Sequence, residues 1–155
     1  MDGVREVIAR HKRRECKIAT SVLTQVEVPD SKLPVGFYDL LKRINRLGVE
    51  TKIATMAHDL RDHYMARSAE FGGKTLSAPD AIHLATAIIH RVTEFHTFDQ
   101  NGNAKNLGLL PLSGNVGGHG LIICKPEAKN PQLDLRRPPR RVTIPGTTQS
   151  NPNAS

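Results

Sequence analysis

The stretch LSAPDAIHLATAIIHRVTEFHTFDQ, residues 76–100, decides the fold of this chain. Between Ser77 and Arg91 the sequence is apolar on nearly every side, which predicts a helix that is buried over most of its surface. The segment EFHTF that follows predicts a strand, and the QNGN segment after it predicts a turn. One carboxylate, Asp80, stands at the start of this helix, and another, Asp99, stands directly after the strand. Their similar placement raises the question of a shared site.

The rest of the chain extends this alternation of helices and strands. Ser21 is a plausible N-cap residue for one helix, and Gly48 is expected to end another. Residues 49–53 are expected to be a short extended or connecting piece, and residues 71–74 a turn. Further helices are expected at residues 4–14, 21–28, 33–47 and 54–69, and strands at residues 17–20, 94–98, 107–112 and 120–124. Strands that alternate with helices indicate an α/β domain with a mainly parallel sheet.

Length and composition favour one ordinary domain. The 155 residues suit a single core, which we expect in residues 1–125, followed by a disordered, basic, Pro-rich tail at residues 126–155. No apolar run approaches the length of a membrane span. Cys16 and Cys124 stand in no metal-binding or redox spacing. These features favour a reducing, cytoplasmic setting with two inert thiols.

The net charge of +7 is concentrated in two clusters. One lies in the tail, and the other lies within residues 10–17, where the sequence holds Arg10, Lys12, Arg13, Arg14 and Lys17. Basic patches suit a polyanion such as nucleic acid. The alternative is an ordinary solvated surface, because net charge promotes non-specific binding without defining a site.

Three carboxylates are candidate site residues, and each also has an ordinary structural explanation. Asp80 is the third residue after Ser77, which is a capping-box pattern, and the helix dipole favours an acid in the first turn. Glu27 stands three residues after Thr24, but its neighbours are mostly apolar, so a solvated helix face would be narrow there. Asp99 follows a strand, where turns favour Asp and where open α/β sheets bind their ligands.

Several other kinds of site are excluded. The segment from Asp99 starts like a calcium loop, but Ala104 replaces its glycine and Leu110 its last glutamate. The glycine-rich residues 117–120 lack the lysine and the helix of a phosphate-binding loop. The sequence has no nucleophile elbow and no zinc spacing. A histidine on an apolar helix is more often a core residue with its hydrogen bonds satisfied than a metal ligand, and we interpret His83 in this way.

Four segments follow one another in an order that resembles a known family. IATSVLTQVEV, LSAPDAIHLATAI, FHTFDQ and LGLLPLSG together resemble the PIN-domain nucleases, most closely the VapC-like toxins of bacterial toxin–antitoxin pairs. The resemblance covers roughly residues 4–125. It implies a PIN-like (Rossmann-like) parallel sheet flanked by helices, and a Mg²⁺- or Mn²⁺-dependent endoribonuclease that hydrolyses RNA phosphodiester bonds. Glu27, Asp80 and Asp99 match three of the family's four acidic positions, which makes them the implied catalytic and metal-binding residues.

The residue types agree with that chemistry. Clustered carboxylates repel one another and need a cation to remain ionised together. Hard oxygen ligands suit Mg²⁺ and Mn²⁺, which also bind phosphate oxygens. The hydroxyls of Thr97 and Ser21 are candidates for orienting a carboxylate or a water molecule. The basic segment at residues 10–17 could hold an RNA backbone in a salt-sensitive manner.

The chain departs from the family pattern at its start. In the family, an apolar strand in the middle of the sheet ends in the first metal-binding Asp, whereas Asp2 follows no apolar run and is a poor substitute. We therefore expect an N-terminally truncated version of the pattern that lacks this first central strand. The loss of such a strand would leave unpaired backbone edges on two others.

Three functions remain open from the sequence. The first is the toxin-type endoribonuclease, acting on RNA, with an antitoxin protein and a second copy of the chain as further candidate partners. The second is a catalytically inactive PIN-like fragment that binds RNA or an antitoxin. The third is a plain α/β interaction module in which Asp80 and Asp99 only cap a helix and form a turn.

Overall fold

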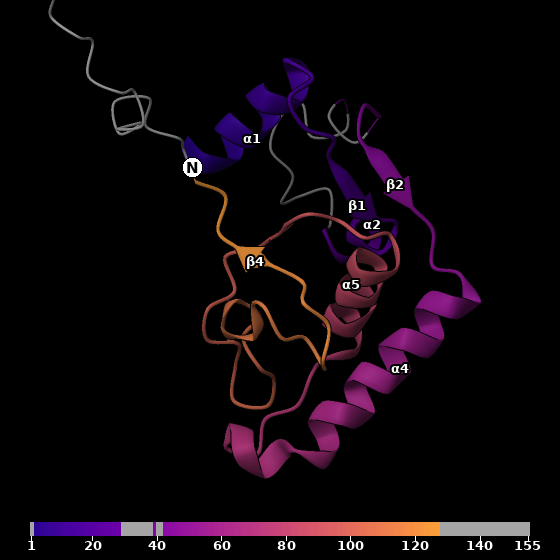
Figure 1. Cartoon of the computed structure of the whole chain (residues 1–155), viewed down its shortest axis with the longest axis vertical. Coiled ribbons are helices and arrows are strands. Elements are labelled where there is room, and N and C mark those ends of the chain that lie inside the picture. Colours follow the sequence, from indigo (N-terminus) through magenta and orange to yellow (C-terminus); the bar gives the residue numbers. More distant parts are fainter. Residues whose placement is uncertain (1, 29–38, 40–41, 128–155) are drawn as a thin grey trace, which may run out of the picture.

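Short parallel strands alternate with helices along the chain (Figure 1). The structure is a computed structural model that describes residues 2–28, 39 and 42–127. The helices are α1 (Asp2–Lys12), α2 (Leu23–Glu27), α4 (Thr51–Ala66) and α5 (Ala78–Ile89), with 3₁₀ turns η2 (Ser68–Phe71) and η3 (Leu110–Leu112). The strands are β1 (Ala19–Ser21), β2 (Asn45–Leu47), β3 (Phe95–His96) and β4 (Ile123–Cys124). The expected α/β class is therefore confirmed.

The strands form two parallel pairs. β1 pairs with β2, and β3 pairs with β4 in a register that aligns His96 with Cys124. Parallel pairing was expected, but the part of the chain that the structure describes holds two separate two-stranded sheets and not one continuous, helix-flanked sheet. Each strand is only two or three residues long, so each pair is held by few backbone hydrogen bonds.

Two of the expected elements have a different conformation. The predicted helix at residues 33–47 falls mostly outside the described residues, but its last part is strand β2. The N–H of Asn45 donates to the carbonyl oxygen of Ile18 at 3.1 Å, and the N–H of Val22 donates to that of Leu47 at 2.9 Å. The backbone of this segment is therefore hydrogen-bonded to β1 and its flanking residues. Gly48 therefore follows a strand instead of ending a helix.

The predicted strand at residues 107–112 is also wrong, because this segment ends in the 3₁₀ turn η3. Pro111 has no N–H to donate to a strand ladder, and its fixed φ suits the start of a helical turn. Leu107, Leu109 and Leu112 are nevertheless buried, so the apolar pattern correctly marks core residues. The expected tail lies, from residue 128 onward, outside the described residues.

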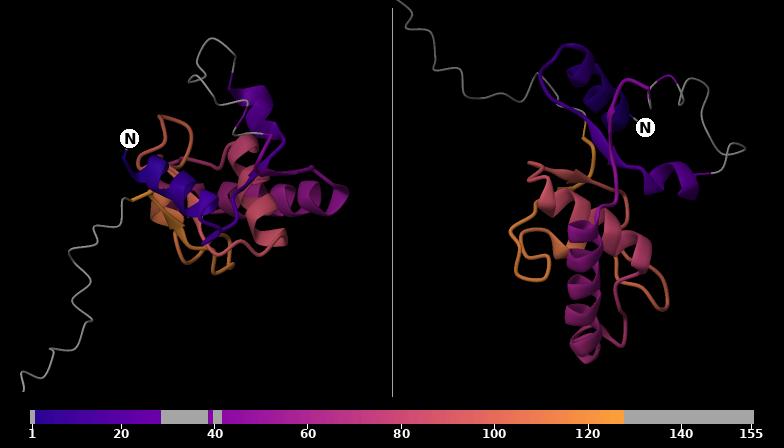
Figure 2. Two further views of the ribbon diagram at one scale, coloured as in Figure 1. Left: turned by 90° about the horizontal axis from the view of Figure 1, so that it is seen from above. Right: turned by 90° about the vertical axis from the view of Figure 1, so that its right-hand side faces the viewer.

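Helices α4 and α5 pack against each other and carry much of the core (Figures 1 and 2). The buried residues of α4 recur at spacings of three and four: Ile53, Ala57, Leu60 and Tyr64. Those of α5 are mostly small: Ala81, Leu84, Ala85, Thr86 and Ala87. Small side chains let the two helices approach closely, and burial of this apolar surface stabilises the fold at roughly 25 cal/mol per Å².

The N-terminal segment contributes no buried hydrophobic side chain to the core in the described part of the chain. Within the described residues, every buried hydrophobic side chain belongs to residues 53–123. Helix α1 has no buried residue and lies at one end of the long axis, with the C-terminal end of α4 at the other (Figures 1 and 2). None of the described helices combines the length and the apolar character that spanning a membrane requires.

Candidate functional site

Asp80 lies in the first turn of α5, where Ser77 caps the helix. The backbone of Ser77 is extended (φ −67°, ψ 155°), and its Oγ accepts a hydrogen bond of 3.2 Å from the Asp80 N–H. The Ser77 hydroxyl in turn donates to Oδ2 of Asp80. The capping pattern is therefore present as expected, and it also fixes the direction of the Asp80 carboxyl group.

The surroundings of Asp80 act on its charge in opposite ways. Partial burial raises the pKa of Asp80 most, and the Ser77 hydrogen bond lowers it. The negative charges of Asp99 and Glu27 raise this pKa further, whereas His83 lowers it. The structure thus places the three acids close enough to interact electrostatically. We call Glu27, Asp80 and Asp99 the carboxylate site.

Glu27 reaches this neighbourhood from the last turn of α2. Its Oε2 lies 2.6 Å from Nε2 of His83 on α5, and the side chains are 35% and 16% exposed. His83 is therefore satisfied, as expected of a histidine on this helix, but by a carboxylate 56 residues away and not by the core. The contact connects α2 to α5 and holds Glu27 on the same side of α5 as Asp80, because residues three apart share a helix face.

Asp99 is fixed by the loop that follows β3. Its Oδ1 accepts a hydrogen bond of 2.9 Å from the N–H of Gly102, and its own N–H donates to Oγ1 of Thr97 at 3.1 Å. Gly102 has φ 61°, and a Cβ there would lie 2.1 Å from the backbone oxygen of Asn106. This turn therefore requires a glycine, whose amide orients the Asp99 carboxylate.

The two hydroxyls considered from the sequence serve the backbone. Thr97 accepts the amide proton of Asp99, so it orders the turn that carries this acid. Ser21 is 5% exposed, and its Oγ accepts from the Leu23 N–H at 3.2 Å, although the N-cap position of α2 belongs to Val22. Both hydroxyls support the elements that carry acids of the carboxylate site.

The carboxylate site suits a hard divalent cation by its chemistry. Its donors are carboxylate oxygens, and a cation would relieve the repulsion that raises the pKa of Asp80. The three carboxylates are nevertheless more widely spaced than a closed ligand shell. Within residues 2–28, 39 and 42–127, the group of donor atoms that all lie within 4.8 Å of one another belongs to Glu94, His96 and Cys124.

Asp2 occupies a different kind of position. It begins α1, where an acid in the first turn is favoured by the helix dipole, and it is exposed. It does not follow a strand, and it is not among the charges that shift the pKa of Asp80. The structure therefore gives no support for Asp2 as a fourth member of the carboxylate site.

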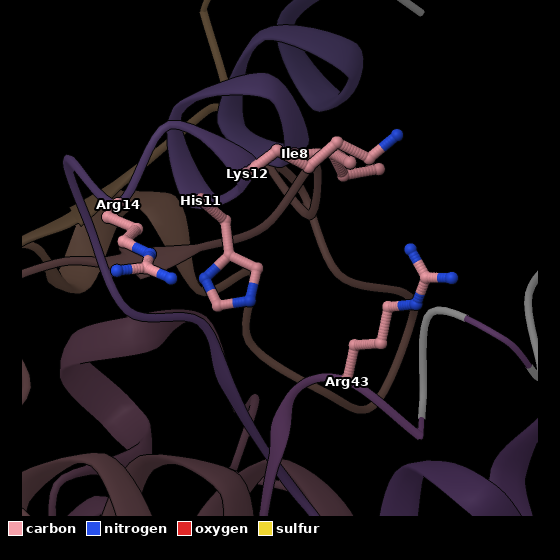
Figure 3. A pocket seen from close by; sticks show the side chains of 5 residues that line it. All are labelled: Ile8, His11, Lys12, Arg14 and Arg43. Carbon is pink, nitrogen blue, oxygen red and sulfur yellow. The ribbon is translucent and has the colours of Figure 1, made fainter.

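A basic pocket of about 400 Å³ lies between the end of α1 and the segment before β2 (Figure 3). It is lined by Ile8, His11, Lys12, Arg14 and Arg43. Figure 3 shows Lys12 and Arg43 on different sides of the space next to the His11 imidazole, with Arg14 on the other side of that ring, so the pocket offers positive charge on more than one side. No pattern in the sequence groups Arg43 with the cluster in residues 10–17, because β1 and β2 must pair to bring them together.

Not all of the basic cluster faces this pocket. Arg13 donates to Glu15 at 2.6 Å and to Glu6 at 2.9 Å, so its charge is balanced locally. Arg10 also lies 4.0 Å from Glu15. The pocket residues Arg14 and Arg43 have no salt bridge within the described part of the chain.

Comparison with known proteins identifies one family. A protein-family model described as PIN domain matches residues 17–106, which is more than half of the chain and includes all three acids of the carboxylate site. No curated protein and no solved structure gives a significant match.

Proposed function

This chain belongs to the PIN domain family, whose members are generally metal-dependent nucleases, and from that premise we propose that it is a metal-dependent endoribonuclease of the VapC-like toxin type. Its substrate would be RNA, cleaved at phosphodiester bonds with Mg²⁺ or Mn²⁺. One observation carries the proposal: Asp80 is fixed at the N-terminus of α5 and is under the electrostatic influence of Asp99 and Glu27.

Glu27, Asp80 and Asp99 are the residues that would hold the cation. When bound, Mg²⁺ or Mn²⁺ supplies stabilisation of the negative charge that develops on the scissile phosphate. The protein's own contribution is to position the three acids from three different elements. The Ser77 hydroxyl orients Asp80, the His83 ring holds Glu27, and the turn after β3 directs Asp99.

The basic pocket is the proposed contact for the RNA backbone. Lys12, Arg14 and Arg43 present cationic groups around one space, and each could neutralise a phosphate. Phosphate contacts of this kind position a nucleic acid without reading its sequence. The pocket therefore supports RNA binding in general and leaves the choice of cleavage site to other contacts.

Cleavage of a mixed RNA substrate by the full chain tests the proposed activity. We expect cleavage with Mg²⁺ or Mn²⁺, its loss on chelation, and a fall of at least about 100-fold in Asp80→Asn or Asp99→Asn, as for the removal of one charge-stabilising group. The control is Asp59→Asn, which changes an exposed acid on α4. Cleavage that survives chelation, or that is equal in Asp80→Asn and Asp59→Asn, would contradict the proposal.

A second candidate function is supported by the two separate strand pairs. Because β1–β2 and β3–β4 form separate sheets within the described residues, we infer as the alternative a catalytically inactive PIN-family chain that binds RNA or an antitoxin protein. Within the described residues, Glu27, Asp80 and Asp99 do not form a group whose ligand atoms all lie within 4.8 Å of one another, which also favours this alternative. Salt-sensitive RNA binding without any metal-dependent cleavage would support it over the nuclease.

A further inference from the structure

Three side chains with metal-binding chemistry meet across the β3–β4 pair. The parallel register places His96 beside Cys124. Glu94 precedes His96 by two residues, and alternate residues of an extended chain project to the same side. One ligand atom from each of these three residues lies within 4.8 Å of the other two. The pairing of the strands thus brings together residues that are widely separated in the sequence.

The histidine of this cluster is incompletely bonded. Its Nε2 lies 3.0 Å from Oε2 of Glu94, but its Nδ1 is buried and, within the described residues, has no hydrogen-bond partner. A buried polar atom without a partner is costly, and native structures contain few of them. The His96 ring therefore keeps bonding capacity that the described protein does not use, beside a carboxylate and a thiol.

We propose that Glu94, His96 and Cys124 form a binding site for a transition-metal ion, with Zn²⁺ as the best match. Zn²⁺ accepts thiolate, imidazole and carboxylate ligands together, whereas Mg²⁺ strongly prefers oxygen ligands. Because Glu94 is exposed, a fourth position is open to water. The site shares no residue with the carboxylate site, so it stands whether or not the chain cleaves RNA.

Metal binding at this place would connect two strands that are otherwise weakly joined. Besides the ladder bonds of these two-residue strands, the Phe95 N–H donates to the Ile122 carbonyl oxygen at 2.8 Å, and the Thr97 N–H donates to the Cys124 carbonyl oxygen at 3.0 Å. As the sulfur–zinc bond forms, the Cys124 thiol releases its proton to solvent. The bound ion would fix β3, and with it the start of the loop that carries Asp99.

The two cysteines provide a matched pair for the experiment. Cys16 is also free and partly buried, but its thiol lies near the carbonyl oxygen of Val7, 3.9 Å away, at α1. The metal-free full-length chain is titrated with Zn²⁺, and the alkylation of each thiol is followed by mass spectrometry. We expect one Zn²⁺ per chain, slower alkylation of Cys124 but not of Cys16, and no protection of either thiol by Mg²⁺.

Substitutions then assign the ligands. Cys124→Ser and His96→Gln should each weaken Zn²⁺ binding at least about 10-fold, because even residues that only orient a metal ligand are worth about 10- to 100-fold. Cys16→Ser should bind as the unsubstituted chain does. Unprotected Cys124, or Zn²⁺ binding that is lost in Asp80→Asn but kept in Cys124→Ser, would overturn the proposal. The alkylation result on the unsubstituted chain decides the matter even if a variant fails to fold.

Discussion

At the scale of single residues, Asp80 is subject to opposing requirements. The N-terminus of α5 and the Ser77 hydroxyl favour its charged form. Partial burial and the charges of Asp99 and Glu27 favour the protonated form, and the net result is a raised pKa. A charged Asp80 therefore destabilises the folded chain in the absence of a cation.

Asp80→Asn should accordingly stabilise the metal-free protein near neutral pH. A raised folded-state pKa means that the contribution of Asp80 to stability is favourable at low pH and is lost as the pH rises through that pKa. The uncharged amide avoids this loss, so the melting temperature should exceed that of the unsubstituted chain at neutral pH and depend less on pH. Thermal unfolding in a chelator over a pH series measures this. A lower melting temperature at neutral pH would show that the charge is stabilising.

Some residues of the two sites could be recognised from the sequence and others could not. The Ser77–Asp80 pattern is local, so its spacing alone predicts the cap. The contact of His83 with Glu27 depends on how α2 packs near α5, and no spacing within either segment indicates it. The sequence predicted Cys124 to be an inert thiol, since only the pairing of β3 with β4 places it beside His96.

At the scale of elements, the cap of α5 should contribute measurably to stability. Ser77→Ala removes the acceptor for the Asp80 N–H, and the loss of an N-cap side chain typically costs about 1 kcal/mol. Urea unfolding measures the change. Ser77→Thr keeps a capping hydroxyl and should recover most of the lost stability, and equal loss in the two variants would contradict the role of the hydroxyl.

The packing of α4 against α5 predicts a larger effect at Leu84. This side chain is 0% exposed, so Leu84→Ala should lower the free energy of unfolding by about 2–5 kcal/mol. Met65, on α4, is 54% exposed, and Met65→Ala should change it by less than about 0.5 kcal/mol. Chemical denaturation of both variants provides the comparison, and similar losses would place the core elsewhere.

The elements that were predicted wrongly share a physical cause. Apolar residues at 44 and 47 fit one face of a helix, but residues 45–47 bond to β1, a partner distant in the sequence. In residues 107–112 the leucines pack into the core, but Pro111 favours a 3₁₀ turn over a strand. Hydrophobic spacing thus identified the buried leucines of residues 107–112, whereas Ile44 and Leu47 are only partly buried. Long-range backbone pairing and proline determined the type of element.

At the scale of the whole molecule, the charge distribution predicts how the proposed RNA binding would depend on salt concentration. Replacing both Arg14 and Arg43 by alanine should weaken RNA binding. The plot of log binding constant against log salt concentration should become less steep by about 0.7 for each phosphate of single-stranded RNA that is no longer neutralised. Arg13→Ala is the matched control, since Arg13 is paired with Glu6 and Glu15. Binding titrations at several salt concentrations measure both variants. If the salt dependence of binding is unchanged in the variant that lacks Arg14 and Arg43, the basic pocket does not contact the RNA.

The arrangement of the strand pairs was the least predictable feature at this scale. Parallel pairing follows from the alternation of elements. Whether the two pairs join depends on side-chain packing between segments, which the order of helices and strands does not specify. The match over residues 17–106 shows the family, and the part of the chain that the structure describes pairs its strands in two separate sheets.

Because the core is formed by residues 53–123, we expect the N-terminal elements to unfold locally before the rest of the described chain. Within the described residues, Ser21 is the one buried side chain outside residues 53–123, so α1, β1 and α2 can detach at a lower free energy than α4 and α5. Native-state hydrogen exchange should find the slowest amides in α4 and α5 and much faster ones in α1 and α2. Such partial opening would carry Glu27 away from His83 and separate it from Asp80 while most of the protein remained folded.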